Sequence, residues 1–134
     1  MKVDELVLAD VDYPEEAQLV SRIEEDYLYI LAEDDKSVPR EGNTENREFF
    51  IGKITAQKMY DQLKTIRAPY TIRRQVHTDL EGNEFYIAIL EGTKEVFLVD
   101  YETYVGATVT YEDAIKFREY LWIFINKEEI GVEL

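Results

Sequence analysis

Alternation of hydrophobic and polar residues runs through much of this chain and predicts a protein rich in β-strands. The segments "QLVSRI" and "YLYILA" are crowded with β-branched and aromatic residues and flank the acidic triplet Glu24–Asp26, which is typical of a β-hairpin. A helix is the alternative for residues 15–32, where an apolar residue recurs every four positions, at Leu19, Ile23, Tyr27 and Leu31. Further strands are predicted at 49–54, 70–77, 84–90 and 95–99.

Two segments have the period of a helix instead. In residues 56–66 the apolar stripe leaves Lys58 and Lys64 outside it and consists of Ala56, Met59, Tyr60, Leu63 and Ile66. In residues 111–125 the stripe consists of Ala114, Phe117, Leu121, Phe124 and Ile125. These stripes predict two amphipathic helices.

Flanking residues predict where these helices begin and end. Thr55 is expected to cap the first helix and Pro69 to stop it. Thr110 and Asp113 resemble a capping box at the start of the second helix. The segments "IGKIT" and "VGATVT" precede the two helices, a faint similarity that a duplicated strand–helix unit would produce.

These elements together predict one α+β domain spanning residues 1–134, with a mostly antiparallel sheet built from hairpins. A turn is expected around Pro14, because "LADVDYPEEA" interrupts the pattern. Residues 34–48 contain proline, glycine and many charges, and are expected to form a surface loop. Loops of that length are often functional.

Composition indicates the cellular compartment in which the protein is expected. The chain of 134 residues contains no cysteine, which excludes disulfides and thiolate metal sites and favours a reducing compartment. Its first twenty residues carry six carboxylates and lack the apolar core of a signal peptide. The longest apolar run, "YLWIFI", is too short to span a bilayer. We therefore expect a cytoplasmic protein without a membrane partner.

Charge is distributed in three blocks along the chain, whose net charge is −14. Residues 1–46 hold fourteen acids and four bases, residues 47–74 hold seven bases and two acids, and residues 75–134 hold thirteen acids and four bases. Such asymmetry can steer a charged partner over long range. The blocks can equally neutralise each other in the folded protein.

No catalytic, cofactor or metal site is predicted. The chain lacks a catalytic serine motif, and its six scattered glycines form no phosphate-binding loop. The single histidine, His77, is expected to be a hydrogen-bonded surface or edge residue rather than a general base. Carboxylates are abundant, but no cluster of them has the spacing of a calcium loop.

The leading functional hypothesis is a small acidic protein that binds another protein. Ten tyrosines suit an interface, since tyrosine combines apolar area with a polar tip. We expect an inhibitor of a basic, nucleic-acid-acting target that mimics nucleic acid, of the anti-defence or immunity-protein kind, without direct nucleic-acid binding. The expected contact residues are Glu24, Glu25, Asp26, Tyr27, Tyr29, Glu33, Asp34 and Asp35.

Three alternatives stay open from the sequence. One is a nucleic-acid-binding or regulatory module that uses the basic segment 47–74. A second is an enzyme with a carboxylate site. The third is an acidic structural subunit whose charge only keeps it in solution. The oligomeric state is not indicated by any sequence feature.

Overall fold

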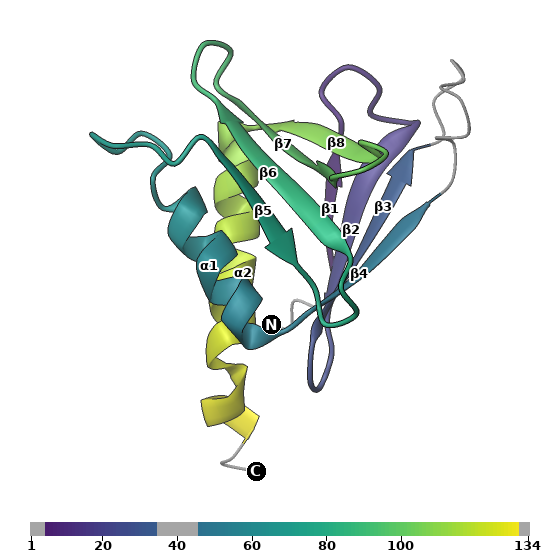
Figure 1. Cartoon of the computed structure of the whole chain (residues 1–134), viewed down its shortest axis with the longest axis vertical. Helices are drawn as coiled ribbons and strands as arrows, with labels where there is room; N and C mark the ends of the chain where they lie inside the picture. Colours follow the sequence, from purple (N-terminus) through teal and green to yellow (C-terminus); the bar gives the residue numbers. More distant parts are fainter. Residues whose placement is uncertain (1–4, 35–45, 132–134) are drawn as a thin grey trace.

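The chain forms two four-stranded antiparallel sheets, each followed by a helix. The computed structural model describes residues 5–34 and 46–131 (Figure 1). Sheet A, with its strands in sequence order, is followed by α1 (Lys53–Leu63) and consists of β1 (Glu5–Ala9), β2 (Ala17–Ile23), β3 (Leu28–Asp34) and β4 (Arg47–Ile51). Sheet B has the same order, is followed by α2 (Tyr111–Gly131) and consists of β5 (Arg74–Thr78), β6 (Glu84–Leu90), β7 (Glu95–Asp100) and β8 (Gly106–Thr110). The predicted α+β class is confirmed.

The segment that was ambiguous between strand and helix is a hairpin. Strands β2 and β3 pair antiparallel from Ala17↔Asp34 to Ile23↔Leu28. Alternation decides the outcome, because Leu28, Ile30 and Ala32 are fully buried while the residues between them face outward. The predicted strands at 84–90 and 95–99 are confirmed, whereas β5 begins at residue 74 rather than 70.

The helices are present, but the expected ends of the first one are wrong. Its N-cap is Gly52, and the Thr55 hydroxyl instead donates to the Thr78 carbonyl, 2.8 Å away. The helix ends at Leu63, well before Pro69. At the second helix the expectation holds, because the Asp113 N–H donates to the Thr110 hydroxyl at 3.1 Å.

Two strands were not predicted, and one loop was predicted to be longer than it is. Strands β1 and β8 are each only five residues long, and β8 runs directly into α2 with no breaker between them. The expected loop 34–48 is shorter at both ends, since Asp34 belongs to β3 and Arg47 begins β4. Residues 35–45 of that loop lie outside the described residues.

The two β-β-β-β-α units have equivalent strand pairings and a similar order of exposed and buried residues. Leu8 pairs with Leu19 at the β1–β2 hairpin, and His77 pairs with Phe85 at the equivalent place in β5–β6. Strands β1 and β5 also share the same order of exposed and buried residues apart from their last position. The glycines of the faint sequence similarity are not equivalent, because Gly52 caps α1 whereas Gly106 opens β8.

A reciprocal pair of aspartates joins the sheets, and we call these the aspartate clamps (Asp10 and Asp79). Both side chains are buried, at 5% and 6% exposure. Asp10 follows β1 and accepts the N–H of Thr108 in β8 at 2.7 Å, while the Val11 N–H donates to the Thr108 carbonyl at 2.8 Å. Through this clamp, sheet A fixes β8, which is the last strand of sheet B.

The second clamp repeats this arrangement with the sheets exchanged. Asp79 follows β5 and accepts the N–H of Phe50 in β4 at 2.8 Å. The Leu80 N–H donates to the Phe50 carbonyl at 2.9 Å. Because β4 and β8 lead into the two helices, the clamps also fix where each helix starts.

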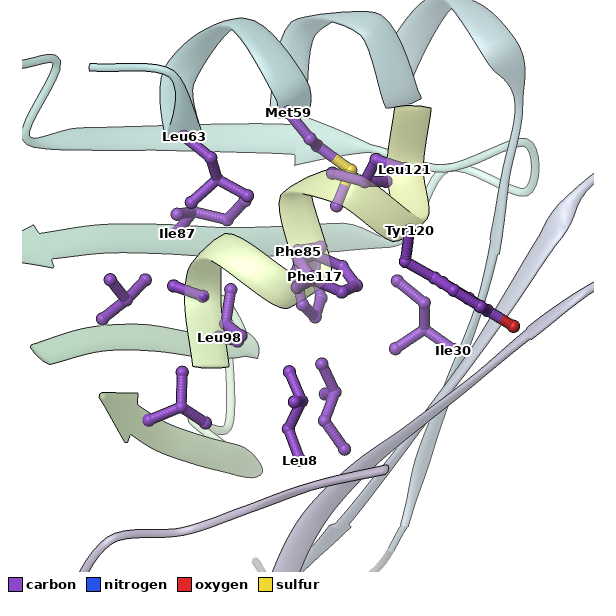
Figure 2. Close-up of a cluster of buried hydrophobic side chains, with 14 of the residues drawn as sticks. Leu8, Ile30, Met59, Leu63, Phe85, Ile87, Leu98, Phe117, Tyr120 and Leu121 are labelled. Atoms are coloured by element: carbon purple, nitrogen blue, oxygen red, sulfur yellow. The ribbon is translucent and has the colours of Figure 1, made fainter. Parts of the chain in front are cut away.

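Each helix reaches across to the sheet of the other unit. The Gln62 amide on α1 donates to the Ile87 carbonyl of β6 at 3.0 Å. The Tyr120 hydroxyl on α2 donates to the Ser21 carbonyl of β2 at 3.2 Å. The helices lie side by side, and the buried core is shared by both sheets and both helices (Figures 1 and 2). Figure 2 shows side chains of α2 among residues of both sheets, including Leu8, Ile30, Phe85, Ile87 and Leu98.

His77 is buried in this core rather than on the surface, although it is hydrogen-bonded and lies on the edge strand β5, the other position expected from the sequence. It is 2% exposed, and its Nε2 lies 2.8 Å from Gln62 Oε1. Since that oxygen can only accept, Nε2 carries the proton, and the buried Nδ1 is left without a partner. Burial, with a smaller effect of Lys58, lowers the pKa of His77 to about 4.

The first prediction concerns the clamps. Asp10→Ala leaves three backbone N–H groups, those of Asp12, Tyr13 and Thr108, without their acceptor. We expect a loss of about 3 kcal/mol in the free energy of unfolding, measured by urea denaturation at neutral pH. Asp12→Ala, at an exposed position in the same turn, is the matched control. Equal stability of the two variants would show that the clamp contributes nothing.

The second prediction concerns pH. The pKa of folded His77 lies below its unfolded value of about 6.5, so its contribution is present above pH 6.5 and is lost as the pH falls towards 4. We expect the free energy of unfolding to fall by up to about 3 kcal/mol more in the wild type than in His77→Leu over that range. As the single histidine, His77 also gives one resolved ring signal by NMR. A midpoint between pH 6 and 7 for that signal in the folded protein would contradict the prediction.

Candidate functional site

The expected contact residues are divided between the two ends of one hairpin. Glu24, Glu25 and Asp26 occupy the turn between β2 and β3, whereas Glu33 and Asp34 lie at the far end of β3. Strand β3 has seven residues, and a strand rises about 3.3 Å per residue, so the two groups are roughly 20 Å apart. Asp35 lies outside the described residues. These acids therefore form two separate groups rather than one.

The two expected tyrosines are together, on the outer side of sheet A. The rings of Tyr27 and Tyr29 lie 5.3 Å and 5.6 Å from the ring of Phe50, measured between centroids. The guanidinium of Arg22 stacks 4.7 Å from the Tyr29 ring centroid. Both tyrosines are half-buried, so part of their surface is already used within the molecule.

A polar cleft opens beside Tyr29, and we call it the acidic cleft. Its volume is about 550 Å³. The cleft lies where β4 meets the β5–β6 turn and the β7–β8 turn, and its aromatic wall is made by Tyr29 and Phe50. Its charged lining consists of the cation Arg47 and the carboxylates Glu48, Glu81, Asp100 and Glu102. Four carboxylates against one guanidinium give the cleft an excess of negative charge.

Two of the acidic side chains, Glu81 and Glu102, are carried on turns whose backbone is fixed by buried aspartates. Asp79, one of the clamps, accepts the N–H of Glu81 at 2.9 Å through Oδ1. Asp100, 8% exposed, accepts the N–H of Glu102 at 3.1 Å through Oδ2. The turns that carry Glu81 and Glu102 therefore need little ordering when a ligand binds.

Tyr29 is connected to the cleft through Glu48. Its hydroxyl donates to the Glu48 carboxylate. Burial, and then this hydrogen bond and the negative charge, raise the pKa of Tyr29 to about 12. Tyr29 thus stays protonated at neutral pH and holds Glu48 at the wall of the cleft.

The basic segment 47–74 does not form one surface. Arg47 lies in the acidic cleft, and Arg67 and Arg73 make ion pairs with Glu112 and Glu91 at 2.9 Å and 3.3 Å. Lys58 is exposed on α1, and Lys64 is exposed just after its end. The block seen in the sequence is therefore dispersed in space and interleaved with acids.

The described residues offer neither a metal site nor a membrane-spanning helix. Among the residues that the structure describes, no group of three or more histidine, cysteine or acidic side chains could hold a metal ion. No helix within the described ranges has both the length and the hydropathy needed to cross a membrane.

Comparison with known proteins gave no match: no protein-family model, no curated protein and no solved structure is significantly similar to this chain. Sequence reasoning found Tyr29 but missed the remainder of the acidic cleft. Glu48, Glu81 and Glu102 come from three distant segments, and each resembles any other surface acid when only the sequence is read. The useful signal was the aspartate two residues before Glu81 and again before Glu102, which begins each turn.

The third prediction tests the link between Tyr29 and Glu48. In Glu48→Gln the pKa of Tyr29 is expected to fall from about 12 but to stay above its ordinary value, because burial is the larger cause. Glu33→Gln, which removes a weaker and more distant charge, should change it little. The measurement is a pH titration of ring-labelled tyrosine by NMR, with Tyr29→Phe to assign the signal. An unchanged pKa in Glu48→Gln would contradict the arrangement.

Proposed function

We propose that this protein is a non-catalytic binding module whose acidic cleft receives a basic segment of another protein. The observation that carries the proposal is the convergence of four carboxylates from three segments onto one cleft of about 550 Å³. The backbone of two of them, Glu81 and Glu102, is held by buried aspartates, so this part of the charge pattern exists before the partner arrives. Preorganised charge of one sign favours fast, specific association with the opposite sign.

The partner best suited to this cleft is a protein whose own ligand is nucleic acid. Carboxylates fixed on a rigid scaffold can occupy the places of phosphates on a basic surface. The aromatic wall of Tyr29 and Phe50 adds apolar contact beside the charges. We therefore propose an inhibitor of a nucleic-acid-acting protein, of the anti-defence or immunity-protein kind, that works in the cytoplasm.

Within this proposal the contact surface is centred on the cleft. It keeps Tyr29 from the set expected from the sequence and adds Glu48, Glu81 and Glu102. The acids of the β2–β3 turn lie at the other end of β3 and are outside this surface. A nucleic-acid-binding role is less well supported, because the basic segment is dispersed.

The fourth prediction tests the cleft with a defined basic peptide. A short peptide that carries lysine and arginine, titrated into isotopically labelled protein at about 50 mM salt, should shift the NMR signals of Glu48, Glu81 and Glu102. The triple variant Glu48→Gln, Glu81→Gln and Glu102→Gln should bind at least about tenfold more weakly. Raising the salt to about 300 mM should weaken binding by the wild type, because screening shortens the reach of the charges.

The matched control removes the same charge elsewhere. Glu15→Gln, Glu25→Gln and Asp26→Asn change three exposed acids in two other turns and should leave the affinity within about twofold of wild type. If this control loses binding and the cleft variant does not, the contact surface is the β2–β3 end of the hairpin and the cleft proposal fails. Preferential binding of an oligonucleotide over the peptide would also overturn it.

A further inference from the structure

An exposed aromatic cluster lies on the outer side of sheet B, and we call it the tyrosine shelf (Tyr86, Tyr101 and Tyr104). Tyr86 stands on β6, and its ring centroid is 5.5 Å from that of Tyr101 and 6.2 Å from that of Tyr104. The rings of Tyr86 and Tyr104 are stacked, with 20° between their planes. Val76, the cross-strand partner of Tyr86 on β5, extends the apolar surface.

The shelf is separate from the hydrophobic core. Phe85 and Ile87, the neighbours of Tyr86 on β6, point to the opposite side of the sheet and are fully buried. Tyr101 and Tyr104 are 43% and 49% exposed, and Val76 is 37% exposed. Grouped aromatic exposure of this kind marks a contact surface more often than single exposed residues do.

The β7–β8 turn holds the outer two tyrosines in place. Asp100 accepts the Thr103 N–H and hydroxyl, both at 2.8 Å, and its carbonyl accepts the Tyr104 N–H at 2.8 Å. The Tyr101 N–H donates to the Glu84 carbonyl at 3.0 Å. Tyr104 has a φ of 61°, a conformation that bulky residues seldom adopt. The ring of Tyr104 is thus presented from a fixed and unfavourable backbone position.

Charge at the turn end of the shelf is negative. Glu84 and Glu102 are both exposed there, and Glu102 also lines the acidic cleft. Arg74 lies on the same side of β5 as Val76, but two positions further from this turn. A polyanion is disfavoured at such a surface, whereas a cation finds both aromatic faces and carboxylates.

We propose that the tyrosine shelf binds an arginine side chain of the partner segment that enters the acidic cleft. This inference rests on the proposed function and specifies the partner further. A guanidinium is planar and weakly hydrated, so it can stack on a tyrosine ring while it pairs with a carboxylate. A lysine ammonium is compact and strongly hydrated, and gains less from the rings. The shelf therefore selects arginine, while the cleft selects positive charge.

The fifth prediction compares two peptides that are identical except that one carries arginine where the other carries lysine. Binding to the wild-type protein is measured by calorimetry at low salt, and we expect the arginine peptide to bind about fivefold more tightly. Tyr104→Asn, which suits the positive φ, should abolish that preference, because it weakens binding of the arginine peptide much more than binding of the lysine peptide. Tyr104→Phe, which keeps the ring, should retain the preference.

Controls separate the shelf from the cleft. Tyr70→Asn removes a tyrosine that is 71% exposed outside the shelf and should keep the arginine preference. If both peptides bind the wild type equally and the cleft variant loses both, the proposed function stands and the shelf inference is overturned. If neither peptide binds the wild type at low salt, the proposed function fails and the inference fails with it. Signals of the shelf that shift with an oligonucleotide instead of the arginine peptide would also overturn it.

Discussion

Two buried carboxylates hold this fold together, because each ties the first turn of one sheet to the last strand of the other. Asp10 and Asp79 are withdrawn from water, yet each accepts three backbone N–H groups, which offsets the cost of burying the charge. The strands to which they are hydrogen-bonded lead into the helices, β4 into α1 and β8 into α2. The positions of both sheets and both helices therefore depend on the same two side chains.

The two units are alike in backbone and different in chemistry. Where α2 uses Tyr120 to reach sheet A, α1 uses Gln62 to reach sheet B, and the core position filled by Leu8 in the first unit is His77 in the second. Gln62 satisfies one nitrogen of that histidine and leaves the other unpaired. The second unit thus carries a buried polar pair that makes the protein sensitive to acid, while the first unit is apolar at the same place.

The clamp geometry also explains why charge gathers at one junction. Asp79 holds a strand of the opposite sheet and, through its second oxygen, the backbone of Glu81. Asp100 likewise fixes the backbone of its own turn, which carries Glu102 and the outer tyrosines. Interactions that stabilise the fold therefore place Glu81 and Glu102 on rigid turns at the acidic cleft, and Tyr101 and Tyr104 on one of those turns. Structure and proposed binding surface share the same supports, so a variant in a buried aspartate should disturb both.

The sequence by itself determined which segments alternate and which repeat every three to four residues, and hence the α+β class and the two helical stripes, while residues 15–32 stayed open between hairpin and helix. Those features are local, because the side-chain period of a strand or helix is written in neighbouring residues. Length does not explain why β1 and β8 were not predicted, because β4 and β5 also have five residues and were predicted. Strand β8 differs in running directly into α2 with no breaker between them. Tertiary structure alone decided that His77 is buried and that Glu48, Glu81 and Glu102 meet. Each depends on which distant segments the clamps bring together, and a contact between distant segments has no period along the chain.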